Sequence, residues 1–397
     1  MPLGIYISVP FCRTKCSYCN FASDVFSKAV SERYVERVRG DIANARQTAS
    51  EMGARIEAEV DSIYLGGGTP TVLEAAQLQR MFAAVRSEFH VEPDAEITVE
   101  CAPGTLTTPV LEGLLMCGVN RVSLGVQSFI DAEAAAVGRL HKRNTVLDDI
   151  ARLRQAGIAN INIDLIAGLP HQTPGSWEES LNATLATEVP HVSVYMLEVD
   201  EDSRLGRELI AGGVRYHAHF VPDEDSTADF YLAACERLDA AGVKQYEISN
   251  FARAGFYSRH NLKYWQRRPY LGFGVDAHSM LFSARPEEDA VRFSTSDALD
   301  SYVAGAALQR TAVSHASALE EHFFLGLRLN RGVDLQRTAK LFGEPALDSV
   351  LPKIKELIGL GLLSQLEGSI RLTDHGRLLS NEVFQAFLTA DHAAAPS

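Results

Sequence analysis

Three cysteines near the N-terminus are the residues with the clearest capacity for chemistry. Cys12, Cys16 and Cys19 fall within one short segment, directly after an apolar run that we expect to form a strand. Thiolates at this spacing can wrap around one compact metal centre. Because a structural zinc site is closed by four ligands, a set of three favours an iron–sulfur cubane that leaves one iron open. The alternatives are a zinc site with a fourth ligand from elsewhere and a chance grouping of buried thiols.

The remaining cysteines and the charge limit the classes of protein that the sequence can encode. Cys101, Cys117 and Cys235 lie in strand-like or helix-like segments, so we expect small core residues there. Cysteines in a chain without the features of an export signal point to a reducing compartment, and we expect a cytoplasmic protein. The net charge of −14 opposes binding to nucleic acids or anionic membranes, and we expect no membrane span.

Short apolar segments alternate with helix-length segments through the first half of the chain. The expected strands cover residues 5–9, 62–65, 96–100, 121–124, 160–166 and 191–197. The expected helices cover residues 31–52, 74–89, 145–156 and 176–186. Repeated strand–helix units predict an α/β fold with a parallel sheet, either open or closed into a barrel.

Polar residues at the strand ends distinguish these two arrangements. Such residues stand at or just beyond the C-terminal ends of five successive strands, from the second to the sixth: Gly66 to Thr69, Glu100, Gln127, Asp164, Tyr195 and Met196. Barrel enzymes gather their chemistry at the C-terminal ends of several strands, whereas an open sheet concentrates it at one switch point. The pattern therefore favours a full or partial (β/α) barrel.

A different pattern begins near residue 310. Two helix-like runs, 315–328 and 347–360, lead into an expected hairpin with a Glu367-Gly368 turn and a final helix, as in a winged helix. We therefore divide the chain into four parts. These are a barrel with the cluster and cofactor site (1–230), an extension (231–310), a winged-helix-like α+β domain (311–385) and a flexible tail (386–397).

The cysteine spacing also carries a resemblance. Cys-x3-Cys-x2-Cys with Tyr18 before the last cysteine is the pattern of the radical-SAM superfamily. Further matching stretches are residues 6–12, 64–70, 97–100, 121–129, 160–170, 246–252 and 260–265. The chain thus resembles the branch that contains the oxygen-independent coproporphyrinogen III dehydrogenases (oxidases) and the haem chaperones. This resemblance implies a partial (β/α)6-type TIM barrel with a 4Fe–4S cluster on the three cysteines.

The resemblance further implies a site for S-adenosylmethionine beside the cluster. The matching positions are Tyr6, Tyr18, Gly67, Gly68, Thr69, Glu100, Gln127, Arg139, Asp164 and Met196. Glycines without a Cβ allow close approach of a ligand to the backbone, and the planar fork of Arg139 suits a carboxylate. Taken singly, the glycines are also compatible with a plain turn and Asp164 with a helix cap.

Residues 260–265 resemble the haem-binding segment of the chaperones. The implied haem-binding residues are His260, Asn261, Tyr264 and Trp265. A neutral imidazole can ligate haem iron, and His260 and Tyr264 would share one face of a helix. The alternative is a buried aromatic turn with a structural histidine. His217 and His219 form another pair, which we expect in a solvated loop.

These features favour a haem chaperone that passes haem to an unidentified acceptor protein. The alternative is the dehydrogenase, which would use S-adenosylmethionine to decarboxylate coproporphyrinogen III. Phe21 stands where the dehydrogenases have a fourth cysteine, and their longer N-terminal extension is missing; both departures favour the chaperone. Ser8 and Asp276 replace residues that are usually His and Gly, so their roles stay open. We also expect an electron donor for the cluster as partner, and a homodimer is compatible with the sequence.

Overall fold

The computed structural model describes residues 1–388 and centres on one large sheet. Six strands follow one another side by side in parallel: β1 (Leu3–Val9), β4 (Glu59–Gly67), β5 (His90–Cys101), β6 (Arg121–Gln127), β7 (Asn160–Ala167) and β8 (His191–Met196). They are apolar on the outward face, where helices cover them. The predicted partial (β/α)6 barrel is confirmed.

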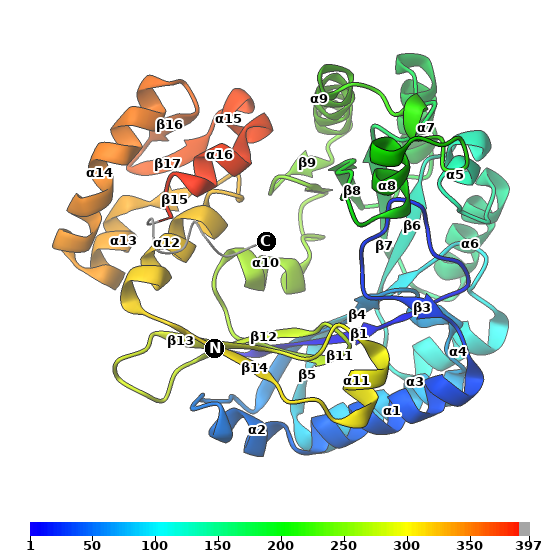
Figure 1. Ribbon diagram of the computed structural model, residues 1–397, viewed down its shortest axis with the longest axis horizontal. Coiled ribbons are helices and arrows are strands. Elements are labelled where there is room, and N and C mark those ends of the chain that lie inside the picture. Colours follow the sequence, from blue (N-terminus) through cyan, green and yellow to red (C-terminus); the bar gives the residue numbers. More distant parts are fainter. Residues whose placement is uncertain (389–397) are drawn as a thin grey trace.

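Helices follow the strands and lie in an arc outside the sheet (Figure 1). The main ones are α1 (Lys28–Ala43), α3 (Ala75–Glu88), α4 (Thr108–Met116), α6 (Arg143–Gln155), α7 (Pro174–Ala186) and α9 (Glu224–Ala240). The single helix expected over residues 31–52 is instead two, because Asn44 interrupts it and α2 (Ala45–Glu51) follows. The acidic segment after residue 200 contains a further helix, α8 (Arg204–Ala211).

The barrel is open, because additional strands extend both ends of the sheet. Next to β1 lies β11 (Tyr270–Gly274) in parallel, followed by the antiparallel β12 (His278–Phe282), β13 (Ala290–Ser294) and β14 (Gln309–Val313). Next to β8 lie β10 (Asn250–Ala252) and β9 (Lys244–Gln245). The short helices α10 (Arg259–Trp265) and α11 (Leu299–Ala304) belong to this extension. The proposed boundary at residue 230 falls within α9.

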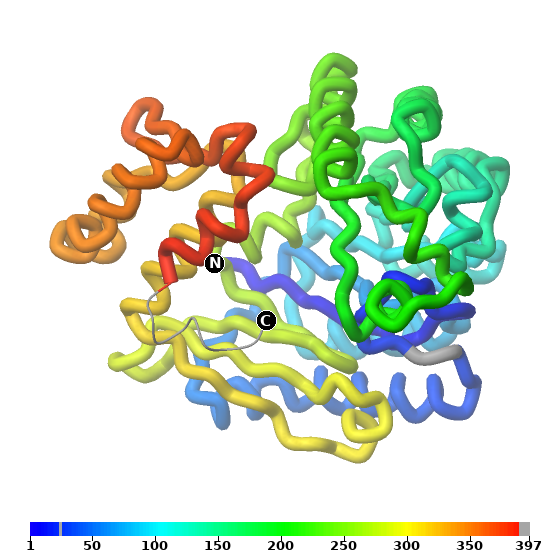
Figure 2. The backbone as a smooth tube through the Cα atoms, turned by 45° about the horizontal axis from the view of Figure 1, so that its top comes forward, coloured from blue at the N-terminus to red at the C-terminus, as the bar shows by residue number. Residues whose placement is uncertain are grey.

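The C-terminal part has its own hydrophobic core, built around Phe323, Ile354 and Ile370. It consists of α12 (His315–Gly326), β15 (Val333–Asp334), α13 (Leu335–Phe342), α14 (Glu344–Gly359), β16 (Leu363–Leu366), β17 (Ser369–Leu372), α15 (Asp374–Leu378) and α16 (Ser380–Gln385). Its three strands form a separate antiparallel sheet. Figure 2 shows this part as a distinct lobe, orange to red, beside the barrel. The predicted winged-helix-like domain is therefore present, with α13 as an additional helix.

The turn of the wing follows from its two residues. Glu367 and Gly368 both have positive φ, 50° and 80°. A two-residue hairpin turn with both φ angles positive has the same twist as the strands that it joins. Most of the predicted tail, residues 389–397, lies outside the described residues.

Candidate functional site

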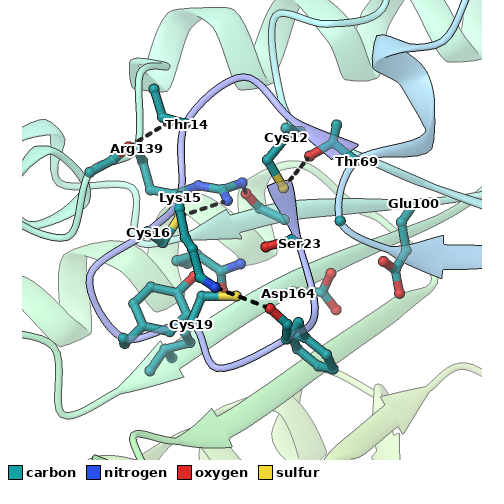
Figure 3. Close-up of a pocket in the computed structure, with 18 of the residues that line it drawn as sticks. Cys12, Thr14, Lys15, Cys16, Cys19, Ser23, Thr69, Glu100, Arg139 and Asp164 are labelled. Atoms are coloured by element: carbon teal, nitrogen blue, oxygen red, sulfur yellow. Dashed lines mark hydrogen bonds between the residues drawn. The ribbon is translucent and has the colours of Figure 1, made fainter. Parts of the chain in front are cut away.

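A cavity of about 640 Å³ lies at the C-terminal ends of the parallel strands (Figure 3). The predicted residues that line it are Cys12, Cys16, Tyr18, Cys19, Gly67, Gly68, Thr69, Glu100, Gln127, Arg139, Asp164 and Met196. They come from five of the six barrel strands and from the loops that follow them. The prediction that polar residues at the C-terminal ends of the strands lie close together therefore agrees with the residues that line this cavity.

The loop after β1 carries all three cysteines to this cavity. The short strands β2 (Phe11–Cys12) and β3 (Asp24–Val25) pair in parallel and hold the two ends of the loop together. Thr69 Oγ1 donates to Cys12 Sγ at 3.7 Å, and Arg139 Nη1 donates to Cys16 Sγ at 3.5 Å. Burial raises the pKa of the Cys12 and Cys19 thiols. All six cysteines of the chain are free thiols.

The donor set of the loop suits an iron–sulfur cluster. Three thiols face one cavity, and a cation and a hydroxyl already point at two of the sulfurs, as hydrogen bonds to cluster thiolates would require. Within residues 1–388 the three thiols do not form a group tight enough to hold a single metal ion, which a larger four-iron cluster does not require.

The glycine turn after β4 brings bare backbone to the same cavity. A Cβ on Gly68 would lie 2.7 Å from the Phe11 carbonyl oxygen, and one on Gly66 would lie 2.8 Å from the Glu100 carboxylate. Gly67 has φ +98°, a conformation that side-chain-bearing residues rarely adopt. The turn is therefore restricted to glycine by both space and conformation, which leaves its backbone accessible to a ligand.

Two buried carboxylates form the floor of the cavity. Burial, then the charge of Asp164, raises the pKa of Glu100 to about 8, although Tyr64 donates to its Oε1 at 2.9 Å. Burial also raises the pKa of Asp164, which accepts hydrogen bonds from Ser123 at 3.0 Å and Asn162 at 2.7 Å. Buried carboxyl groups with raised pKa values can accept hydrogen bonds from hydroxyl groups of a ligand and, when protonated, can also donate one.

Arg139 and Gln127 also line the cavity, Arg139 with a cationic group and Gln127 with an amide. Burial alone would lower the pKa of Arg139, but the neighbouring Tyr18 and Cys16 raise it, so the guanidinium is firmly charged. Gln127 has a positive φ of 69°, and its Oε1 is buried without a partner among the described residues. An unpartnered buried acceptor and a fixed cation beside the cysteine loop fit an amino-acid group such as that of S-adenosylmethionine.

Tyr6 does not line the cavity, contrary to the prediction. Its partner in the sheet register is Tyr64, and its ring lies 6.1 Å from that of Tyr64 and 6.3 Å from that of His260. The side chain thus belongs to an aromatic group in the barrel interior on the side of α10.

In the segment predicted to bind haem, the histidine is buried and both of its ring nitrogens are hydrogen-bonded. His260 is 1% exposed; its Nδ1 shares a hydrogen bond with Ser62 at 3.1 Å and its Nε2 one with Tyr264 at 2.9 Å. Burial, then Lys263, lowers the pKa of His260 to about 3, so the imidazole is neutral. The expected shared helix face of His260 and Tyr264 is present, but both ring nitrogens are occupied. Asn261 and Trp265 are half-buried on the same helix.

His217 and His219 do lie in the loop region between α8 and α9, but His217 is not merely solvated. His217 Nδ1 lies 3.0 Å from Nε2 of His171, and the His171 ring stacks on Phe220. Both His171 and His217 have positive φ values, 67° and 61°.

Sequence reasoning missed several polar groups of the interior. Tyr64 and Ser123 line the cavity, and Arg121 is only 1% exposed, with an Nε that has no partner among the described residues. The charge of Arg121 lowers the pKa of both Glu100 and Asp164. The period of two along β6 places Arg121 and Ser123 on the same face as Gln127, and this alternation could have revealed them.

Comparison with known proteins agrees with this geometry. The Radical SAM superfamily model matches residues 6–183, and the HemN C-terminal domain model matches residues 313–379. The heme chaperone HemW of Bacillus subtilis is 36% identical over 386 residues, which are 96% of this chain and 98% of the relative. The chain belongs to the HemW family. HemW of Lactococcus lactis is 34% identical, with 98% of each chain covered.

The HemW family fold is shared with a solved enzyme. The structure of coproporphyrinogen III oxidase (HemN) from Escherichia coli, described as a radical SAM enzyme, has a TM-score of 0.81 to this chain. It is 25% identical, and the match covers 97% of this chain and 90% of that one. Within residues 1–388, none of the helices has the length and apolarity needed to cross a membrane.

Proposed function

We propose that this protein is a cytoplasmic haem chaperone that binds haem and passes it to an acceptor protein. The support is its near full-length similarity to several relatives named heme chaperone HemW, in Bacillus, Lactococcus and Mycobacterium tuberculosis. The observation that carries the cofactor part is the convergence of three free thiols, a glycine turn and Arg139 on one cavity.

Cys12, Cys16 and Cys19 would hold a 4Fe–4S cluster at the outer end of this cavity. When bound, the cluster supplies an electron and an open iron that the amino-acid group of S-adenosylmethionine can chelate. Thr69 and Arg139 donate to two of the sulfurs and would stabilise their thiolate form. The cluster also calls for an electron donor as partner.

The other cavity residues would orient S-adenosylmethionine. Arg139 offers a planar fork to its carboxylate, and the backbone at Gly67 and Gly68 accommodates the amino-acid group. Glu100 and Asp164 lie where they could accept hydrogen bonds from ribose hydroxyls. Tyr18 and Met196 supply the apolar wall.

The haem site would include the α10 segment. Because His260 is hydrogen-bonded through both ring nitrogens, haem ligation by His260 requires separation from Ser62 or Tyr264. Its lowered pKa favours the neutral imidazole, the form that binds iron.

The dehydrogenase function is a second candidate, because the coproporphyrinogen III oxidase shares this fold. We do not favour it, because Phe21 lines the cavity where a fourth cysteine would be expected in the dehydrogenases. The test is anaerobic incubation with S-adenosylmethionine, a reductant and coproporphyrinogen III, followed by porphyrin chromatography. We expect no protoporphyrinogen IX. Decarboxylated product at a rate dependent on Cys16 would establish the dehydrogenase instead.

A further inference from the structure

Arg328 occupies the junction between the barrel and the C-terminal lobe. It follows α12, and its guanidinium carbon lies 4.2 Å from the centroid of the Trp265 ring on α10. The Phe384 ring of α16 is 5.9 Å away on the C-terminal side. Arg328 thus lies against a tryptophan at the end of the segment predicted to bind haem.

The backbone around Arg328 is fixed to the barrel. Its carbonyl accepts from Ile248 N at 3.1 Å, and Asn330 N donates to the Tyr246 carbonyl at 3.0 Å. Between these two contacts, Leu329 forms an antiparallel bridge with Glu247. The position of the guanidinium is therefore set by the barrel edge and by Trp265 together.

Two hydrogen-bond donors at this junction have no acceptor. Arg328 Nε and Trp265 Nε1 are both buried without a partner in the part of the chain that the structure describes. Nor does the Arg328 side chain form an ion pair within residues 1–388, whereas the nearby Arg267 is paired with Glu321 at 2.8 Å. Buried donors are normally satisfied, so this pair indicates a missing acceptor.

Glu247 is the acidic group that faces this junction. It is fully buried, and burial raises its pKa, although the charge of Arg328 opposes this shift. Its Oε1 accepts from Ser249 N and from the Asn250 side chain, and its Oε2 has no partner among the described residues. Glu247 therefore interacts electrostatically with Arg328, but among the described residues it is not the hydrogen-bond acceptor of Arg328 Nε.

We propose that Arg328 and Trp265 anchor a carboxylate of a planar aromatic ligand. A carboxylate has two oxygens for two unpartnered donors, and the face of the Trp265 ring that Arg328 does not cover is a flat surface for the aromatic part. This inference rests on the proposed function, which makes the ligand haem and the carboxylate one of its propionates. Trp265 lies on the same helix, α10, as His260 and Tyr264, so the anchor belongs to the segment predicted to bind haem.

The test compares haemin with haemin dimethyl ester, which lacks the free carboxylates. Both are titrated into anaerobically purified full-length protein, as wild type, Arg328→Gln, Arg328→Lys and the control Arg337→Gln. Arg337 is an exposed arginine of the same lobe. Because a charged hydrogen bond contributes strongly, we expect Arg328→Gln to weaken haemin binding by roughly tenfold to a hundredfold.

The ester then separates a propionate anchor from a structural role. We expect the ester to bind wild type as weakly as haemin binds Arg328→Gln, with no further loss in the combination. Arg328→Lys should retain part of the preference for haemin over the ester, and Arg337→Gln should retain all of this preference. Equal losses for haemin and ester, or unchanged binding in Arg328→Gln, would overturn the anchor while wild-type haem binding stands. A wild type that binds neither ligand would overturn the proposed function itself.

Discussion

The phenol of Tyr64 donates a hydrogen bond of 2.9 Å to Oε1 of Glu100, on the floor of the cavity below the cysteine loop. This bond is too weak to offset the burial of the carboxyl group, whose pKa is raised to about 8. Glu100 therefore carries a proton at neutral pH in the ligand-free protein, and its ionisation is linked to both stability and ligand binding.

Replacement of Glu100 by Gln should make stability less dependent on pH. Because the pKa is about 8 in the folded state, above its value in the unfolded chain, the folded state binds the extra proton. The contribution of Glu100 to the free energy of unfolding is thus present in acid and is lost as the pH rises through about 8. We expect Glu100→Gln to unfold at higher denaturant concentration than wild type at pH 8.5, and the difference to shrink at pH 5. A constant difference across this range would contradict the raised pKa.

The cysteine loop should assemble a cluster. Anaerobically reconstituted wild type should contain about four iron and four sulfide per chain, with a broad visible absorbance. The triple change of Cys12, Cys16 and Cys19 to Ala should abolish both, whereas Cys235→Ala should leave them unchanged because that thiol lies outside the cavity. Stoichiometric zinc without sulfide in the wild type would refute the cluster.

Asp164 should contribute to binding of S-adenosylmethionine but not of the cluster. Asp164→Asn retains the shape of the side chain and removes its charge, so we expect about tenfold weaker binding. The measurement is the change that S-adenosylmethionine causes in the EPR spectrum of the reduced cluster, titrated for both proteins. The exposed Asp148→Asn is the matched control. Identical titrations of wild type and Asp164→Asn would remove Asp164 from the site.

His260 should support the fold whether or not it binds haem. His260→Ala leaves Ser62 Oγ and the Tyr264 hydroxyl without their partner in a buried place, so the free energy of unfolding should fall by about 1–3 kcal/mol. Urea titration measures this difference. Asn261→Ala, which changes a half-buried neighbour on the same helix, should have little effect. Equal stability of His260→Ala and wild type would mean that the buried hydrogen bonds are not formed in solution.

Local patterns were enough to predict the barrel and much of its cavity. Glu100, Gln127 and Asp164 could be placed because parallel strands bring their C-terminal ends to one edge, whatever the sequence distance between them. The wing could be predicted because Glu367-Gly368 can adopt the positive φ angles of its turn.

Features that depend on packing between distant segments could not be predicted in this way. The hydrogen bond that occupies Nδ1 of His260 comes from Ser62 on β4, which is far away in the sequence. The stacking of Arg328 on Trp265 depends on how the C-terminal lobe packs against α10. The break at Asn44 also has only a weak local signal, because Gly40 lies one turn before it inside α1 and no proline follows.

A haem chaperone must bind haem as a cargo that it can release. The direct measurement is a haemin titration of the anaerobic wild type, followed by addition of excess apomyoglobin as a haem acceptor. We predict a Soret band that saturates at about one haem per chain and then moves to that of myoglobin over time. Absorbance that rises without an endpoint, or haem that never leaves the protein, would contradict a haem-chaperone function.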